Sequence, residues 1–152
     1  KSIHQKEREK LDKLKDELEK NTRAEEKSNE KIAEDKRAVT RAQEDLATND
    51  NDQKDATAAI TLQQAEVTRA RAGNADVYKA ANKSLEEQQD AKKKLQVRAE
   101  DLHKKIDGWN NEIATEGRNV AAARQAQAQN TDAITKQKLL IKDLETKLKA
   151  VR

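Results

Sequence analysis

Apolar residues recur every seventh position along most of the chain. In the first half one such row starts at Leu11, and a weaker companion row lies three residues later. Two rows with this offset are the a and d positions of a coiled coil. The second half has its own pair of rows, starting at Tyr78 and Ala81. The pattern therefore predicts two long helices, an arm over about 1–72 and an arm over about 77–152.

The two heptad frames differ by four residues, and the change falls between Arg71 and Tyr78. A four-residue stutter can be absorbed in a continuous coiled coil, so a straight parallel dimer is one alternative. Gly73 and Asn74, however, tolerate the left-handed conformation that ends many helices. Asp76 is a suitable N-cap for a following helix. These residues favour a turn at about 73–76 and predict an all-α fold, a long antiparallel two-helix coiled-coil hairpin.

Two further stretches look like loops by composition, at 48–52 and 107–111. The heptad frame runs through both of them, and through Gly117, without losing phase. A loop would be expected to reset the phase, so we predict weak but continuous helix there. A three-helix bundle with breaks at these two stretches is the remaining alternative.

Polar residues interrupt the predicted seam. We expect long polar side chains at these positions to reach water and to fix the register of the two helices. Trp109 is expected to be an anchor of the seam near Val39, with a binding hot spot as the minority interpretation. The polar seam positions are Glu25, Asp35, Asn49, Gln53, Gln63, Lys92, Glu116 and Gln127.

Composition agrees with an extended helical structure. The chain has 152 residues, of which 40% are charged and 34% are hydrophobic, too few for a large compact core. Its 32 basic and 29 acidic residues are interleaved, which argues against nucleic-acid binding. No apolar run is long enough to span a bilayer, so no membrane insertion is expected. Because the sequence lacks Met, we expect it to be a segment of a larger chain.

Catalytic chemistry is not expected. An enzyme needs groups that converge on a water-excluding site, and a pair of helices offers no such interior. His4 and His103 would lie far apart along the hairpin, so they cannot share a metal ion. We therefore predict no enzyme activity, no cofactor and no metal site, and expect both histidines to be single and solvated.

The turn is the candidate recognition surface. Arg and Tyr are enriched at protein interfaces, and the end of a helical hairpin is accessible to a partner. Capping and solubility explain several of the same residues equally well. The candidate contact residues are Arg69, Arg71, Gly73, Asn74, Asp76, Tyr78 and Lys79.

The sequence around the turn resembles colicin-type bacteriocins. Arg71–Asp76, which reads Arg-Ala-Gly-Asn-Ala-Asp, is similar to a helix-to-helix connection in a colicin translocation region. Val77–Leu85, which reads Val-Tyr-Lys-Ala-Ala-Asn-Lys-Ser-Leu, is similar to part of the receptor-binding hairpin of nuclease colicins. Close similarity covers about 15 residues, and the remaining likeness is one of composition.

This resemblance implies a non-enzymatic binding and spacer module of a secreted bacterial toxin. Such a module would be a monomeric hairpin that engages an outer-membrane receptor of the target cell through or near its tip. One alternative is the α-hairpin of a periplasmic adaptor in a tripartite efflux or secretion system, whose tip meets an outer-membrane channel. Another alternative is a purely structural spacer.

Overall fold

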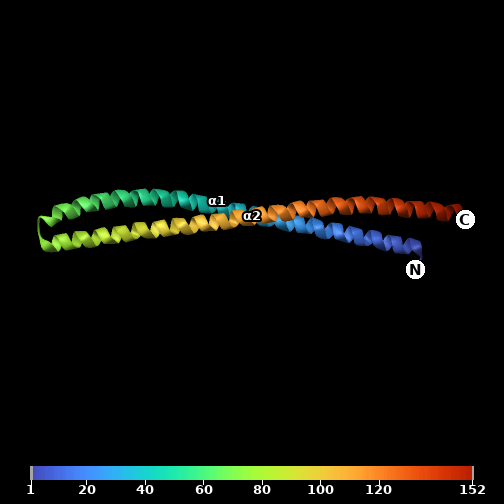
Figure 1. The fold of residues 1–152 in the computed structure, drawn as a ribbon, viewed down its shortest axis with the longest axis horizontal. Helices are drawn as coiled ribbons and strands as arrows, with labels where there is room; N and C mark the ends of the chain where they lie inside the picture. Colours follow the sequence, from blue (N-terminus) through green and yellow to red (C-terminus); the bar gives the residue numbers. More distant parts are fainter. Residues whose placement is uncertain (1, 152) are drawn as a thin grey trace. The chain divides into compact units, whose positions relative to one another are not determined.

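The computed structural model describes residues 2–151 and contains two α-helices. Helix α1 spans Ile3–Arg71 and helix α2 spans Ala75–Val151 (Figure 1). The two helices pack against each other, and the described residues include no strand. The predicted all-α helical hairpin is therefore confirmed. Both loop-like stretches, at 48–52 and 107–111, are helical, which excludes a three-helix bundle.

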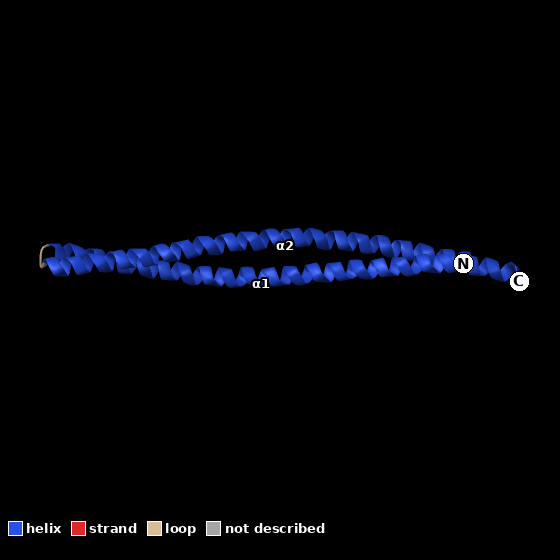
Figure 2. Cartoon of the chain, turned by 90° about the horizontal axis from the view of Figure 1, so that it is seen from below, coloured by secondary structure: helices blue, strands red, loops and turns tan. Residues whose placement is uncertain are grey.

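The connection between the helices comprises residues 72–74, drawn as the tan loop in Figure 2. The predicted turn at 73–76 was placed too late, because Ala75 and Asp76 already belong to the first turn of α2. None of the described residues has a positive φ, so the expected left-handed conformation at Gly73 and Asn74 is wrong. A 3.0 Å hydrogen bond from Gly73 N to Ala70 O closes the last turn of α1 instead.

Asn74, not Asp76, is the N-cap of α2. The Asn74 side-chain oxygen accepts a hydrogen bond of 2.7 Å from the main-chain nitrogen of Asp76. Its carbonyl oxygen accepts the first helical bond, from Tyr78 N at 3.0 Å. These two bonds are those of an N-cap residue. Asp76 lies two residues into the helix, where a carboxylate still interacts favourably with the helix dipole.

The helices divide into two compact units. The terminal unit consists of residues up to Asp35 and from Glu112 onward, and the turn unit consists of Lys36–Asn111. Within the turn unit the buried apolar residues are Val39, Ala42, Val67 and Leu102. Within the terminal unit they are Val120, Ala123, Ile134 and Ile141. Every one of these residues belongs to a predicted heptad row.

The heptad rows face inward along both units, with two exceptions. Leu148 and Val151, the last members of the second-half rows, are exposed. Helix α1 begins at Ile3, and His4 already contacts Glu145. Leu148 and Val151 follow Glu145 in α2 and line an open hollow with Ile3 and His4 at the start of α1, so they are only partly covered.

Two polar seam residues are more deeply buried than expected. Asp35 is 2% exposed and Asn49 is 6% exposed, so neither side chain reaches water. Both are short side chains at d positions, whereas longer ones such as Gln53, Lys92 and Gln127 remain partly accessible. Asn130, a further seam residue with a short side chain, is also buried, whereas Asn21 and Ser28 are half-buried. A short side chain therefore permits burial in the seam but does not by itself determine it.

Hydrogen bonds between the helices define the antiparallel register in each unit. In the turn unit Gln63 donates to Ala81 O and Asn49 donates to Leu95 O, both at 2.9 Å. In the terminal unit Asn21 Nδ2 donates to Asn130 Oδ1 at 2.6 Å. Gln137 Nε2 donates to Glu7 O at 2.8 Å, closer to the chain ends. Residues that lie later in α1 thus pair with earlier residues of α2.

Candidate interaction surfaces

The tip, defined as residues 69–79, carries all seven predicted contact residues. Six of them are exposed, and Tyr78 is half-buried because it starts the seam of α2. Capping accounts for Asn74, and the ion pair between Arg69 and Glu66, at 3.0 Å, occupies Arg69. Gly73 has no side chain to offer a partner. Arg71, Tyr78 and Lys79 are therefore the residues of the tip best placed to contact another molecule.

Arg71 and Tyr78 form a pair across the turn. The guanidinium carbon of Arg71 lies 5.8 Å from the centroid of the Tyr78 ring, within reach of a cation–π interaction. Arg71 Nη2 also donates to the Tyr78 hydroxyl at 3.5 Å. A hydrogen bond with Asn82, followed by the contact with Arg71, lowers the pKa of Tyr78 from its usual value near 10. The turn thus holds an aromatic ring and a cation together at the surface.

The tip is net positive. Between Glu66 and Lys83 the chain has four basic residues (Arg69, Arg71, Lys79 and Lys83) and two acidic ones (Glu66 and Asp76), a net charge of +2. The preceding segment, 56–65, contains no charged residue. The positive charge at the turn is therefore not neutralised by its immediate neighbours in α1.

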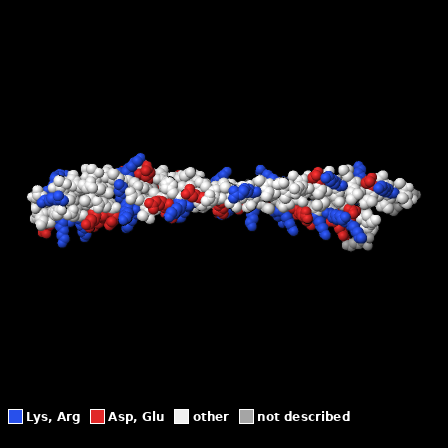
Figure 3. Space-filling view, viewed as in Figure 1, with Lys and Arg blue, Asp and Glu red and all other residues white. Residues whose placement is uncertain are grey.

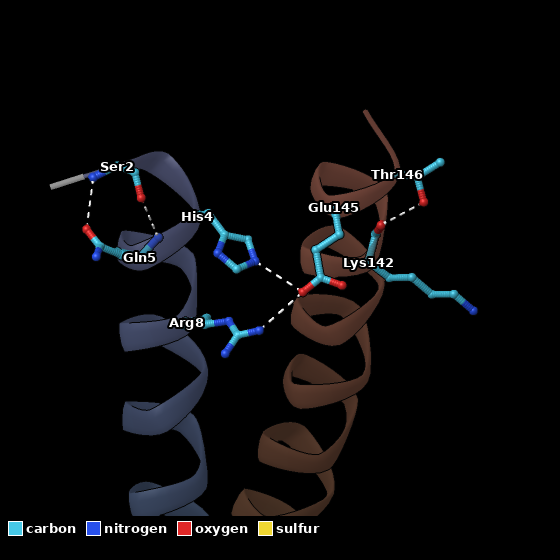
Figure 4. A network of polar contacts seen from close by, with 7 residues as sticks. All are labelled: Ser2, His4, Gln5, Arg8, Lys142, Glu145 and Thr146. Carbon is cyan, nitrogen blue, oxygen red and sulfur yellow. Dashed lines mark hydrogen bonds and ion pairs between the residues drawn. The ribbon is translucent and has the colours of Figure 1, made fainter. Parts of the chain in front are cut away.

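A second polar cluster lies at the open end of the terminal unit, where α1 begins. Glu145 Oε1 contacts His4 Nε2 at 3.1 Å and Arg8 Nη2 at 3.2 Å, so one carboxylate oxygen joins two side chains of the other helix (Figure 4). These two contacts, that with His4 first, lower the pKa of Glu145. The expectation of a solvated, isolated His4 was wrong, whereas His103 is exposed. The antiparallel register was the signal that could have paired His4 with Glu145.

The outer faces of the helices differ sharply in charge. We define the outer positions as those at b, c and f of each heptad, which are exposed throughout the ranges below. In the terminal unit the outer positions of α1 from Asp12 to Glu34 are charged with one exception, Ala33. The charged residues are Asp12, Lys13, Asp16, Glu19, Lys20, Arg23, Glu26, Lys27, Glu30 and Glu34.

In the turn unit α1 loses this charge. Its outer positions from Ala47 to Thr68 are mainly Ala, Thr and Asn, and the only charged ones are Lys54 and Asp55. On the face drawn in Figure 3, the part of α1 next to the turn is accordingly mostly white. We call this surface the α1 neutral face. It also carries Leu62, which is 71% exposed.

Helix α2 shows the opposite distribution. In the turn unit its outer positions from Lys79 to Lys104 are charged except for Ala80 and Val97. In the terminal unit the outer positions from Arg118 to Leu139 are mainly Ala, Gln and Thr. We call this second surface the α2 neutral face. It ends at Leu139, which is 63% exposed.

Comparison with known proteins gives no guide to identity, since no protein-family model, curated protein or solved structure matches the chain. Among residues 2–151 neither helix has an apolar stretch long enough to cross a membrane. Within the same range no group of three or more His, Cys, Asp and Glu side chains is arranged to hold a metal ion.

Proposed function

We propose that this hairpin is a non-enzymatic binding and spacer module that engages a partner protein through its tip. The observation that carries the proposal is the contact between exposed Arg71 and half-buried Tyr78, with exposed Lys79 beside it. An aromatic ring and a guanidinium held in contact before binding lose little side-chain entropy when a partner covers them. Both residue types are enriched at binding hot spots.

The charge of the tip defines the chemistry of the partner. A tip of net charge +2 is attracted to a surface that presents carboxylates. Lys79 is exposed and forms no ion pair with another of residues 2–151, so it is available to such a surface. Binding should therefore weaken as the salt concentration rises, since exposed charge pairs are screened over about 8–10 Å at physiological ionic strength.

The resemblance to colicin-type bacteriocins supports a proposal for the kind of protein that contains this module and for its partner. The module would belong to a secreted bacterial toxin, and its partner would be a receptor in the outer membrane of the target cell. The rest of the hairpin would hold the tip away from the functional parts of the toxin.

Binding to outer-membrane vesicles from Gram-negative cells tests the proposal. The fluorescently labelled protein is titrated with vesicles, and the triple variant Arg69→Ala, Arg71→Ala, Tyr78→Ala is compared with the unmodified chain. The triple variant should lose binding while its helicity by circular dichroism is retained. Its matched control is the double variant Arg37→Ala, Arg41→Ala, which removes two exposed arginines of α1 outside the tip.

Three outcomes decide whether the tip binds a partner and whether that partner lies in the outer membrane. Loss of binding in the tip variant alone supports recognition through the tip. Equal binding by the tip variant and the unmodified chain would remove the tip from the interface. If vesicles from a broad set of Gram-negative species bind neither protein, the outer-membrane setting is wrong.

A further inference from the structure

One apolar side chain lies alone on the charged outer face of α2. Val97 is 58% exposed, and it occupies an f position in the middle of the outer positions between Lys83 and Asn111. The charged outer residues on either side of it alternate in sign along the helix. All of them are exposed and belong to the turn unit. They are Asp90, Lys93 and Lys94 before Val97, and Glu100, Asp101 and Lys104 after it.

Most of these charges are not paired within the hairpin. Of the six, Asp101 alone forms an ion pair with another of residues 2–151, with Lys105 at 3.3 Å. Asp90 and Lys94 have the four-residue spacing at which other Asp and Lys residues of these helices form ion pairs, but they are not paired in the described part of the chain. The charges beside Val97 are therefore available to a second molecule.

We propose that this second molecule is another copy of the chain, and that α2 of one copy packs antiparallel against α2 of the other about a two-fold axis at Val97. Such an axis is the commonest symmetry of soluble oligomers, and it requires a surface that is complementary to itself. Only residues of the turn unit take part. Helix α1 does not obstruct the contact, because f positions face away from the seam. The dimer differs from the monomeric hairpin expected from the sequence and does not depend on the proposed function of the tip.

The charges beside Val97 are complementary to themselves about this axis. Residues equally far before and after Val97 lie opposite each other in the two copies, and Val97 lies against its own counterpart. An apolar contact is then surrounded by charge pairs, as in an interface with an apolar centre and a polar rim. Each charge pair is made twice, and the three pairs are Lys94 with Glu100, Lys93 with Asp101 and Asp90 with Lys104.

The same register contains one like-charge match between Lys83 and Asn111. Glu87 comes opposite Asp107, at flanking c and b positions away from the axis. Both side chains are exposed in the hairpin, and water and salt screen a repulsion at the margin of a contact. This match should weaken the dimer but leave the centre of the contact unchanged.

Other positions of the axis place like charges at the centre. An axis between Lys93 and Lys94 sets these lysines against each other. An axis at Asp90 matches opposite charges at the flanking positions, but it sets Asp90 against itself and Val97 against Lys83 along the central line. Like charges cost most where water is excluded, so the axis at Val97 is favoured.

The area of the contact sets the expected affinity. From 83 to 111 the helix is about 43 Å long at 1.5 Å per residue, so a strip about 10 Å wide covers about 430 Å² on each copy. The total of about 870 Å² is below that of stable complexes and lies in the range of weak, transient ones. We therefore expect a dissociation constant on the order of 100 μM at low salt.

Sedimentation equilibrium of the full chain tests the proposal. The chain should be mainly dimeric at about 1 mM in low salt, ten times the expected dissociation constant. In about 1 M salt, where the Debye length is about 3 Å, the dissociation constant should rise at least about fivefold. A chain that stays monomeric at about 1 mM overturns the proposal, and so does a dimer that salt does not weaken.

Charge reversal identifies the surfaces that meet. A copy with Lys93→Glu and Lys94→Glu, and a copy with Glu100→Lys and Asp101→Lys, should each dimerise at least about tenfold more weakly with itself, because like charges then meet. An equimolar mixture should form a heterodimer about as strong as the original dimer, because all four matches have opposite signs again. One of the two copies carries a fluorophore, so that sedimentation detects the heterodimer. Failure of the mixture to associate overturns the proposed contact.

The matched control for charge reversal is the double variant Lys13→Glu, Lys20→Glu, which reverses two exposed lysines on the outer face of α1 in the terminal unit. It changes the net charge by the same amount as Lys93→Glu with Lys94→Glu and should leave the dissociation constant within about twofold of the original. Circular dichroism establishes that each variant keeps its helices. Equal weakening by the control would mean that net charge, and not this face, governs association.

Cysteine cross-linking tests the position of the axis, and the chain has no native cysteine to interfere. A residue on the axis lies against its own counterpart, so Val97→Cys should form a disulfide-linked dimer. The control is Asp90→Cys, which lies on the same line of f positions but away from the axis and should cross-link more slowly. Equal rates, or faster cross-linking through Asp90→Cys, would overturn the axis at Val97.

Discussion

The side-chain amide of Asn49 donates a hydrogen bond of 2.9 Å to the main-chain carbonyl oxygen of Leu95 on the facing helix. Gln53, one turn further along α1, donates to the Asn49 side-chain oxygen at 2.6 Å. Gln63 makes the same kind of bond, to Ala81 O. Because Asn49 and Gln63 bind the backbone of α2, they fix the relative position of the helices whatever side chain the facing residue carries.

Replacing Asn49 by Leu should therefore raise the stability of the hairpin and make the register of its helices less specific. The substitution removes the hydrogen bond to Leu95 O and the one from Gln53. Gln53 is partly accessible to water, so the gain in apolar burial should exceed this loss and stabilise the hairpin by about 1 kcal/mol. The register should become less specific, as when a polar a/d residue is removed from a coiled coil. Urea unfolding measures the first effect. Disulfide formation between Ala56→Cys and Gln88→Cys, compared with a pair shifted by one heptad, measures the second.

The control for this experiment is Asn51→Leu, at an exposed position in the same turn of α1. It should change neither the unfolding midpoint nor the preference for the matched cysteine pair. If Asn49→Leu destabilises the hairpin, the amide contributes more than its burial costs.

The turn offers a pair of adjacent substitutions with different expected effects. Asn74→Ala removes the side-chain acceptor that caps α2 and should destabilise the hairpin by about 1 kcal/mol. Gly73→Ala should be close to neutral, because Gly73 has no positive φ and an added Cβ would lie 3.7 Å from Ala70 O. Thermal unfolding of the two variants distinguishes them. If Gly73→Ala instead destabilises the hairpin strongly, Gly73 has the left-handed conformation expected from the sequence.

The sequence predicted the fold because the heptad rows carry information over many turns. A single misplaced residue does not alter the phase of such a row, so 48–52 and Gly108 were correctly assigned to helices. The details of the turn depend on two or three residues and on φ angles that composition does not determine. Gly73 was suited to a left-handed helix end, but in the structure a 3₁₀-type hydrogen bond closes α1. Asp76 was suited to be the N-cap of α2, but Asn74 is the N-cap.

Surface features were harder to predict than the seam. The His4–Glu145 contact required the register to be known to within one turn, since a shift of one heptad would separate the two side chains. The neutral faces became visible only when the exposed positions had been assigned, because Ala and Thr look like ordinary helix residues in the sequence. The burial of Asp35 depends on its short side chain and not on its heptad position alone.

Two glycines within α2 limit the stability of the terminal and turn units. Gly108 and Gly117 are exposed helical residues, and a Cβ at either position would meet nothing within 4 Å. Gly108→Ala and Gly117→Ala should each stabilise the hairpin by about 1 kcal/mol, because Ala loses less backbone entropy in a helix. Urea unfolding of both single variants and the double variant tests this. A destabilised variant would show that the glycine is needed for a contact or a bend in α2.

The buried carboxylate of Asp35 should lower the free energy of unfolding of the terminal unit. Its Oδ1 lies 3.7 Å from Lys31 Nζ, but its Oδ2 is buried without a hydrogen-bond partner. A buried acceptor left without a partner costs about 1–3 kcal/mol. Asp35→Leu should therefore raise the free energy of unfolding, while Lys31 keeps its 3.3 Å ion pair with Glu112. Urea unfolding measures the change, and Glu34→Leu, at an exposed neighbouring position, is the control. A loss of stability in Asp35→Leu would mean that the carboxylate is better solvated than its burial indicates.

Glu7 links the stability of the terminal unit to pH. Gln137 Nε2 donates to Glu7 Oε2 at 2.7 Å, and this bond, followed by that from Lys10, lowers the pKa of Glu7 below its usual 4.5. Because the pKa is lower in the folded state, the ionised form contributes stability above pH 4.5, and this contribution is lost as the pH falls through the folded pKa. Glu7→Gln should therefore flatten the decrease in unfolding midpoint between pH 5 and pH 2, relative to the exposed control Glu26→Gln. Identical pH profiles for the two variants would show that the Gln137 contact does not favour the carboxylate.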